Sequence, residues 1–397
     1  MERIGIYGGA FNPPHIGHIE GAKYAVSALQ LSKLYVIPSF TSPHKKAPAN
    51  SPTPEQRVEM LEVELAGCSK ISVSDLELKR GGTSYTVDTV TEMKKQHPNA
   101  ELILLMGTDM FLSFESWRAP EKILSMASIG VLYRGDPEEE TKIDRQKDVL
   151  EKKGATVHLV KNPVTTISST DLRRMLIFGC GEEYIPRGVN AYIRENNLYD
   201  VNKSLKNLTQ QELEQEVIKL LKPNRVAHVL GCRDTAAELA KRNGINEEEA
   251  ARAGLLHDIT KALSEPLQKA ICRTYGVSDR ELAGETGKTL HALTGSVIAR
   301  EVFGESEAVT CAIRTHTTGA PNMSMLQKII YVADYMEPNR DFPSVEKLRK
   351  LAFEDIDAAF KAGLEMTIYM LRQQGREITP QSQAALAYLN RKEETIC

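Results

Sequence analysis

The hydrophobic and polar positions of the chain follow two different periods in its two halves. Up to about residue 200, short apolar runs alternate with stretches in which apolar residues recur every three or four positions. The short runs predict strands and the periodic stretches predict helices, because side chains alternate across a strand and repeat along one face of a helix. The predicted strands include Arg3–Tyr7, LYVIPS, ELILLMG, IGVLYR and TVHLV, and the predicted helices include PEQRVEMLEVEL, TVDTVTEMKKQ and SSTDLRRMLI. This alternation is typical of βαβ units, so we expect an α/β domain with a Rossmann-like parallel sheet.

From about residue 209 the strand pattern disappears. The apolar residues keep helical spacing in segments such as TQQELEQEVIKLL, EEEAARAGLLHD and MLQKIIYVADYM. The stretch ENNLYDVNKSLKN between the halves is polar and weakly periodic, which suits a connection. Since 397 residues exceed one ordinary core, two domains are expected. The sequence predicts an α/β domain over 1–200, a linker over 201–208 and an all-α domain over 209–397.

The composition limits the classes of binding partner that the protein is expected to have. A net charge of -3 provides no general attraction to nucleic acid or membrane, so neither is expected, and an anionic ligand has to be bound by local groups. The six cysteines form no CxxC pair, and the chain has no signal-peptide pattern or long apolar span. This usage predicts a protein of the reducing cytoplasm. The sequence does not decide whether the chain forms an oligomer.

The stretch RIGIYGGAFNPPHIGH lies where a predicted strand passes into a predicted helix. Helix N-termini at the carboxyl ends of parallel strands offer free N–H groups and partial positive charge to phosphate. Gly8 and Gly9 allow the backbone to approach an anion closely, because they have no Cβ. His15 and His18, three residues apart, are expected to face the same phosphate. The alternative interpretation is an ordinary Gly/Pro turn with two surface histidines.

Two motifs carry a family resemblance. GGAFNPPHIGH resembles the GGxFxPxHxGH signature of the nucleotidyltransferase superfamily, and ISSTDLRR, about 150 residues later, resembles its ISSTxxR signature. SPHKK, SYTVDTV, MGTDMFLSFESW and VNAYIRENNLY narrow the similarity to bacterial nicotinate-nucleotide adenylyltransferase over residues 1–200.

This resemblance implies adenylyl transfer from ATP to nicotinate mononucleotide, with Mg²⁺ on the phosphates and no protein nucleophile. Catalysis then comes from alignment and fixed positive charge. It implies that His18 and His15 are catalytic, His18 being the closer stabiliser of the transition state. The implied substrate-binding residues are Gly8, Gly9, Phe11, Lys45, Lys46, Thr86, Asp109, Trp117, Ser169, Thr170 and Arg173. Trp117 would stack on the nicotinate ring and Thr86 would meet its carboxylate. Pantetheine phosphate or another mononucleotide is the alternative acceptor, against which SYTVDTV and Trp117 argue.

In the second half, the positions of the histidines are the main evidence for a functional site. Beyond residue 200 the only histidines are His228, His257, His291 and His316, each in a different predicted helical segment, and His257 is followed directly by Asp258. A further carboxylate, Asp334, lies in an apolar helix, where an unpaired charge is costly. Imidazoles and carboxylates from several helices are the makeup of a metal site in a bundle core. Taken singly, each histidine is more often a core or surface residue than a ligand.

The order H…HD…H…H…D resembles the HD-domain metal phosphohydrolases. RVAHVLGC, AGLLHDITK, HALTG, IRTHTTG and ADYMEPNR are similar to the bacterial HD family that splits dinucleoside tetraphosphates symmetrically. The resemblance implies hydrolysis of diadenosine tetraphosphate to two ADP, with Lys261 as a catalytic candidate and Arg340 as a phosphate-binding one. Two histidines beyond the simplest HD pattern suit two metal ions, iron or manganese rather than magnesium. The implied ligands are His228, His257, Asp258, His291, His316 and Asp334, with Asp258 bridging.

Two alternatives for the second half stay open. It could cleave a nucleoside monophosphate or a guanosine alarmone instead. It could also be a sensor that binds a nucleotide without turnover and regulates the first half, although a sensor has little physical reason to keep six ligands.

Overall fold

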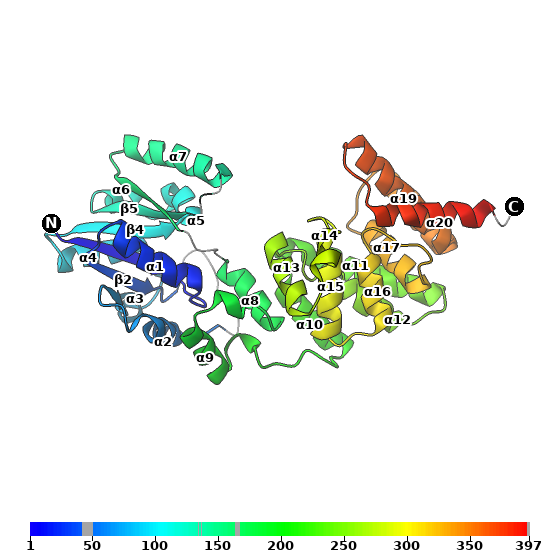
Figure 1. Ribbon diagram of the computed structural model, residues 1–397, viewed down its shortest axis with the longest axis horizontal. Coiled ribbons are helices and arrows are strands. Elements are labelled where there is room, and N and C mark those ends of the chain that lie inside the picture. The colour runs from blue at the N-terminus through cyan, green and yellow to red at the C-terminus, as the bar shows by residue number, and fades with distance from the viewer. Residues whose placement is uncertain (42–50, 134, 136, 163–166, 395–397) are drawn as a thin grey trace. The chain divides into compact units, whose positions relative to one another are not determined.

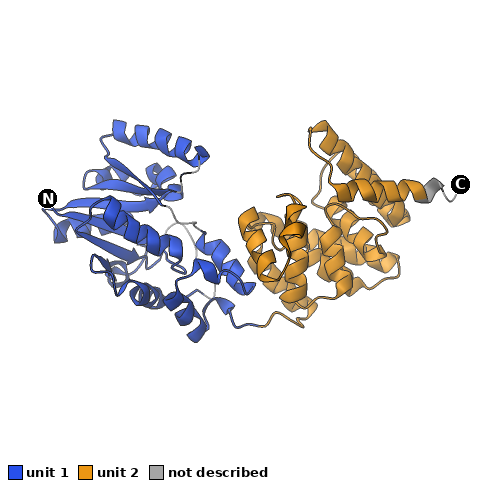
Figure 2. Cartoon of the chain, in the orientation of Figure 1, with its two compact units in different colours: residues 1–203 blue, residues 204–397 orange. Residues whose placement is uncertain are grey.

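The computed structural model describes residues 1–41, 51–133, 135, 137–162 and 167–394 (Figure 1). Contacts between residues divide the chain into two compact units, Met1–Lys203 and Ser204–Cys397 (Figure 2). Each unit is described by itself.

The first unit is built on a parallel sheet. Its described strands are β1 (Arg3–Gly9), β2 (Lys33–Pro38), β3 (Ile71–Val73), β4 (Glu101–Gly107), β5 (Ala127–Tyr133) and β6 (Val157–Lys161). Their order is β3-β2-β1-β4-β5-β6, with every neighbouring pair parallel. β1 pairs with β2 on one side and β4 on the other, so the strand order reverses there. In sheets of this type ligands bind at that point, beyond the carboxyl ends of the strands.

Helices cover both faces of this sheet (Figure 1). They are α1 (Ile16–Ala28), α2 (Pro54–Leu65), α3 (Leu76–Arg80), α4 (Thr86–Gln96), α5 (Thr108–Leu112), α6 (Pro120–Leu124), α7 (Pro137–Lys152), α8 (Ser169–Ile177) and α9 (Arg187–Glu195), with 3₁₀ turns η1 (Phe114–Ser116), η2 (Glu182–Tyr184) and η3 (Leu198–Asp200). Along β4, Leu102 and Leu104 join one core cluster and Ile103 and Leu105 the other. Buried residues therefore alternate between two helical layers, as a sheet covered on both faces requires.

The second unit is helical throughout its described residues. Its helices are α10 (Gln210–Leu220), α11 (Pro223–Arg242), α12 (Glu247–Leu256), α13 (Glu265–Thr274), α14 (Asp279–Ala283), α15 (Leu290–Glu301), α16 (Glu307–Thr315), α17 (Met325–Met336), α18 (Val345–Glu354), α19 (Ile356–Gln373) and α20 (Pro380–Glu394). α11 packs against α12 and α17, and α16 packs against α12, α15 and α17. At Gly254 a Cβ would lie 2.8 Å from the Cα of Arg233, so only glycine allows α11 and α12 to approach this closely.

The predicted fold class, an α/β unit followed by an all-α unit, is confirmed. The pattern placed α2, α4 and α17 at their observed bounds, but β3, α7, α13, α18 and α20 are among the elements that it did not identify. Among the helices formed by the described residues, none has the length and apolar character that a bilayer crossing needs.

Candidate active sites, one in each unit

In the first unit, the loop after β1 brings the two motif histidines together. His15 is the N-cap of α1, and His18 is the third residue of that helix. The two imidazoles are stacked with centroids 3.5 Å apart, and Nδ1 of His18 accepts a hydrogen bond of 3.3 Å from the backbone N–H of His15. Burial, with the neighbouring His15, holds the pKa of His18 well below its usual value. The imidazole of His18 is therefore neutral near pH 7 in the ligand-free site.

The start of α8 lies against the same loop. Ser168 caps this helix by accepting a hydrogen bond from the backbone N–H of Asp171. Arg173 donates one of 2.5 Å to the carbonyl of Asn12, and the hydroxyl of Ser169 donates one of 3.4 Å to the carbonyl of Pro13. The structure thus joins the N-termini of α1 and α8, whose free N–H groups and partial positive charge suit a polyphosphate.

Three residues that the sequence reasoning missed hold this loop. Nη1 of Arg57 donates a hydrogen bond of 2.7 Å to the carbonyl of Ala10, and the hydroxyl of Tyr199 donates one of 2.7 Å to Oδ1 of Asn12. Arg57, Tyr199 and Asn12 are all less than 9% exposed. Asn12 lies inside GGAFNPPHIGH and Tyr199 inside VNAYIRENNLY, so the motifs contain both residues. The motifs do not predict the hydrogen bond between them, because a motif does not specify which residues are in contact.

The other predicted residues of the first unit lie at several places around the carboxyl ends of the strands. Gly8 is exposed at the end of β1, and a Cβ there would meet open space. Thr86 begins α4, and Asp109 is exposed in α5, directly after β4. Trp117 is half-buried beside Phe114, with ring centroids 5.3 Å apart.

Two further predicted residues, Phe11 and Thr170, lie beside His18 and Arg173, and two others are not described. Phe11 is buried with its ring edge-on to His18, and Thr170 accepts a hydrogen bond of 3.2 Å from Arg173. Lys45 and Lys46 lie outside the described residues.

In the second unit, the four imidazoles meet as two pairs. His228, from α11, and His257, which ends α12, have their Nε2 atoms 3.2 Å apart. His291, from α15, and His316, which ends α16, also have Nε2 atoms 3.2 Å apart. All four side chains are at least nine-tenths buried. Helices distant in sequence therefore converge on one cluster.

Asp258 lies between these pairs and offers one oxygen to each. Its Oδ2 is 3.6 Å from Nε2 of both His228 and His257. Its Oδ1 is 3.2 Å from Nε2 of His291 and 3.8 Å from Nε2 of His316. Asp334 belongs to the first pair, since its Oδ1 is 3.1 Å from Nε2 of His228. We name His228, His257, Asp334 and Asp258 Oδ2 subsite A, and His291, His316 and Asp258 Oδ1 subsite B.

The outward ring nitrogens fix the tautomers of three imidazoles. Nδ1 of His257 lies 2.7 Å from the carbonyl of Gly254, and Nδ1 of His316 lies 2.6 Å from the carbonyl of Ile313. Nδ1 of His228 lies 3.0 Å from the buried carboxylate of Glu337. Since carbonyls and carboxylates only accept, each Nδ1 carries the proton and each Nε2 presents a lone pair.

Burial keeps three imidazoles of the cluster, those of His257, His291 and His316, neutral near pH 7. It holds the pKa of His257 well below the usual value, lowers that of His316 to about 4, and, with His316 and Lys261 nearby, lowers that of His291 to about 2. The pKa of Asp334 lies well below its usual value despite burial, because its contact with His228, the nearby His257 and His316 and the Arg340 guanidinium favour the ionised carboxylate. Neutral imidazoles and an ionised carboxylate are the forms that bind metals.

These residues fit a metal site. In subsite A the lone pairs of His228 and His257 face each other, an arrangement that a cation between them relieves. Their 3.2 Å separation also matches two nitrogens that each lie about 2.1 Å from one shared ion. Asp258 is only 2% exposed, and yet neither of its carboxylate oxygens accepts a hydrogen bond of normal geometry from a described residue. His228, His257 and Asp334 form one potential ligand group, and His257, Asp258 and His316 another.

Three cationic side chains surround this cluster. Nζ of Lys261 is 3.3 Å from Oδ1 of Asp258 and from Nε2 of His291. Arg340 donates a hydrogen bond of 2.7 Å to Asp334, and Arg225 forms an ion pair with Asp258. Arg225 and Glu337 were missed from the sequence, although each lies three residues from a predicted ligand and so one turn away along the chain.

Comparisons with known proteins match each unit to a family. Residues 6–175 match the Cytidylyltransferase-like family and residues 225–339 match the HD domain. A Borreliella burgdorferi protein, "Probable nicotinate-nucleotide adenylyltransferase", is 35% identical over 50% of this chain and 96% of its own length. The "Bis(5'-nucleosyl)-tetraphosphatase, symmetrical" of Halalkalibacterium halodurans is 38% identical over 43% of this chain and 92% of its own length.

One relative spans both units. A Mycoplasma pneumoniae protein, "Probable nicotinate-nucleotide adenylyltransferase/Ap4A hydrolase", is 31% identical over 373 residues, which cover 91% of this chain and 97% of that protein. The chain belongs to the nicotinate-nucleotide adenylyltransferase/Ap4A hydrolase family.

Proposed function

We propose that the chain is a bifunctional enzyme with one activity in each unit. The first unit transfers the adenylyl group of ATP to nicotinate mononucleotide, releasing nicotinate adenine dinucleotide and pyrophosphate. The second hydrolyses diadenosine tetraphosphate symmetrically to two ADP. Similarity to a relative that spans both units supports this pairing.

In the first unit, the chain's contribution is alignment and fixed charge. His15, His18 and the N-terminus of α8 face one loop, so a polyphosphate bound there meets imidazole donors, N–H groups and the Arg173 guanidinium together. Negative charge that develops on the phosphates during transfer is stabilised by these groups without reorganisation. Mg²⁺, when bound to the phosphates, adds further charge neutralisation. Thr86, Asp109 and Trp117 are proposed contacts for the acceptor and the ribose.

An acceptor panel tests this activity. The purified chain with ATP and Mg²⁺ is offered nicotinate mononucleotide, nicotinamide mononucleotide and phosphopantetheine, and the dinucleotide product is measured by chromatography. Turnover is expected to be highest with nicotinate mononucleotide. Preferential adenylylation of phosphopantetheine would contradict the assignment.

In the second unit, the observation that carries the proposal is the division of the Asp258 carboxylate between two imidazole pairs. We propose two ions, one in each subsite, with Asp258 bridging them. Iron or manganese suits this mixed nitrogen and oxygen ligand set. When bound, a pair of cations activates water and screens the charge of the attacked phosphate.

The chain's own cations orient the substrate there. Lys261, Arg225 and Arg340 all reach the carboxylates of the cluster. With metal on these carboxylates, the three side chains are free to hold phosphate oxygens on either side of the bond that breaks. Lys261 is the catalytic candidate because it contacts residues of subsite B.

Two measurements test this half. Anomalous scattering at the iron and manganese edges identifies, counts and locates the ions. Product chromatography with diadenosine tetraphosphate, a nucleoside monophosphate and a guanosine alarmone identifies the substrate. Two ADP from the dinucleotide are expected. Binding without turnover would instead favour the alternative in which this unit is a nucleotide sensor.

We also place the protein in a reducing compartment such as the cytoplasm. Among the described residues, Cys68, Cys180, Cys232, Cys272 and Cys311 form no disulfide with one another. Disulfide-free cysteines are usual where cellular reductants keep thiols reduced.

A further inference from the structure

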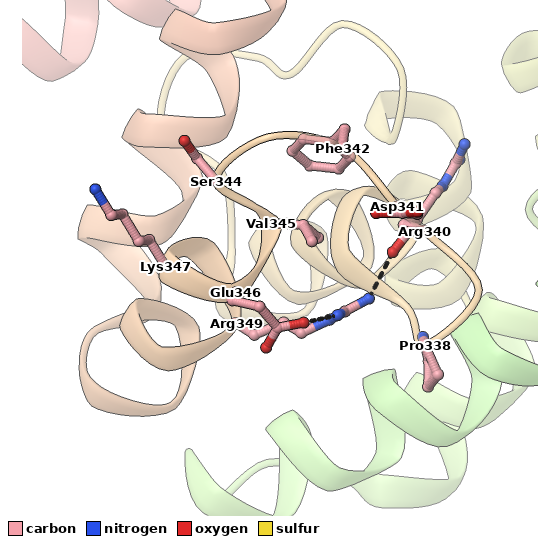
Figure 3. A pocket seen from close by; sticks show the side chains of 9 residues that line it. All are labelled: Pro338, Arg340, Asp341, Phe342, Ser344, Val345, Glu346, Lys347 and Arg349. Atoms are coloured by element: carbon pink, nitrogen blue, oxygen red, sulfur yellow. Dashed lines mark hydrogen bonds and ion pairs between the residues drawn. The ribbon is translucent and has the colours of Figure 1, made fainter.

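A second layer of contacts lies behind subsite A, around the turn that follows α17. Figure 3 shows this region from close by, with Arg349 of α18 reaching under the turn toward the carbonyl of Arg340. The side chains here line a pocket of about 500 Å³ formed by Pro338, Arg340, Asp341, Phe342, Ser344, Val345, Glu346, Lys347 and Arg349.

Arg349 binds three backbone carbonyls of this turn. Its Nε donates a hydrogen bond of 2.9 Å to the carbonyl of Met336. Its Nη2 donates one of 2.9 Å to the carbonyl of Glu337 and one of 2.8 Å to that of Arg340. The last carbonyls of a helix lack partners within the helix, and a guanidinium offers several donors in a rigid fork that can bind them together. Arg349 therefore fixes the path of the chain from 336 to 340.

That path carries two side chains that hold ligands of subsite A. The carboxylate of Glu337 orients His228, and backbone and side-chain N–H groups of Asn339 fix its other oxygen at 2.7 and 2.8 Å. Arg340 donates to the carboxylate of Asp334 at 2.7 Å. Within the described part of the chain, Glu337 and Arg340 form no hydrogen bond or ion pair with an imidazole of subsite B.

We propose that Arg349 is a positioning residue for subsite A alone. It touches no ligand, and acts by holding the turn whose side chains orient His228 and Asp334. The inference rests on the two-ion site proposed above. Loss of an outer-shell partner typically weakens metal binding by about 10- to 100-fold, so losing Arg349 is expected to weaken one ion roughly tenfold and leave the other unchanged.

The test is Mn²⁺ binding to the full chain without nucleotide, followed by calorimetry and electron paramagnetic resonance. Arg349→Met keeps the apolar stem but removes the donors. The matched controls are Glu346→Gln, which removes only the ion pair of Arg349 with Glu346, and Lys347→Met, which removes one charge from the same helix. We expect Arg349→Met to weaken one ion and to replace the signal of a coupled pair with that of an isolated ion. Both controls should bind two ions as the wild type does.

Two variants that each impair one subsite identify which ion depends on Arg349. In His291→Asn, where subsite B is impaired, adding Arg349→Met should weaken the remaining ion. In His228→Asn, where subsite A is impaired, it should change nothing. Equal weakening in both backgrounds, or in neither, would overturn the inference. If Arg349→Met does not fold, Glu337→Gln tests the same path and should show the same selectivity. If the wild type binds one ion, the two-ion proposal fails by itself, and the inference is then decided by whether Arg349→Met weakens that ion.

Discussion

The hydroxyl of Tyr199 donates a hydrogen bond of 2.7 Å to Oδ1 of Asn12, across 187 positions of sequence. Asn12 also accepts from Arg173 through its carbonyl and donates from Nδ2 to Ser51 at 3.1 Å. The histidine-bearing loop is thus tied to the last turn of its own unit.

We expect Tyr199→Phe to leave Oδ1 of Asn12 buried without this partner, at a cost of about 1–3 kcal/mol in the free energy of unfolding. Because a small displacement of reacting groups is costly, the kcat/KM of dinucleotide synthesis should fall roughly tenfold. Tyr24→Phe is the matched control, since Tyr24 is 43% exposed. Unchanged synthesis in Tyr199→Phe would show that the loop does not depend on this bond.

His18→Ala should lower dinucleotide synthesis at least about a hundredfold, the usual effect of losing a preorganised donor to developing charge. Circular dichroism should show an unchanged fold. His97→Ala, a half-buried histidine at the end of α4, is the control. Near-normal turnover in His18→Ala would remove its catalytic role.

Asp258→Asn and Asp334→Asn should differ in how many ions they lose. Asp258 faces both imidazole pairs, so its loss should weaken both ions and abolish hydrolysis. Oδ1 of Asp334 lies 3.1 Å from Nε2 of His228 and 3.7 Å from Nε2 of His257, and both imidazoles belong to subsite A. The loss of Asp334 should therefore remove one ion. Metal content by mass spectrometry checks this. Synthesis by the first unit serves as the internal control and should be unchanged.

Alanine substitutions at two glycines of the second unit should have different effects, one on metal affinity and the other on stability. A Cβ at Gly231 would collide with Oε2 of Glu337, whereas one at Gly254 would meet backbone atoms of Arg233. Gly231→Ala should therefore reduce metal affinity about 10- to 100-fold with little loss of stability, because a side chain can move aside. Gly254→Ala should destabilise the fold by about 1–3 kcal/mol. Thermal unfolding and Mn²⁺ titration separate these effects, with Gly284→Ala as control. The reverse pattern would contradict the assignment.

The metal-free chain should lose stability as pH falls below about 6.5. Burial lowers the pKa of His316 to about 4 and that of His291 to about 2 from 6.5. In the unfolded chain both imidazoles take up protons near pH 6.5, while in the folded chain they stay neutral, so acid favours unfolding. The loss at about pH 5 is roughly 2 kcal/mol for each imidazole.

Calorimetry with a chelator at about pH 7 and pH 5 measures this loss. Because carboxylates also titrate in acid, the comparison with His316→Asn decides, and that variant should lose less stability. An equal loss in both proteins would contradict the prediction.

Much of the fold could be predicted because it is encoded locally. The central strands of the sheet are continuous apolar runs, and α2 and α17 each begin at a capping box formed by a Thr or Ser and a following Gln. Two of the missed elements carry weak local signals, whereas α13 follows a serine at its N-cap, has a proline in its first turn and is clearly amphipathic, so its own pattern could have predicted it. β3 has three residues, and α7 buries only Ile143 and Leu150 among its 16 residues. Such elements are stabilised by packing rather than by their own pattern.

By itself the sequence determined which side chains are candidates for the chemistry: the two loop histidines, the start of α8, and the imidazoles and carboxylates of the second unit. Only the tertiary structure decided how they are paired. It divides Asp258 between two imidazole pairs, ties Tyr199 to Asn12, and places Arg349 behind Glu337 and Arg340. The physical reason is that periodicity and capping report contacts within one element, whereas these contacts join elements that meet only when the cores pack.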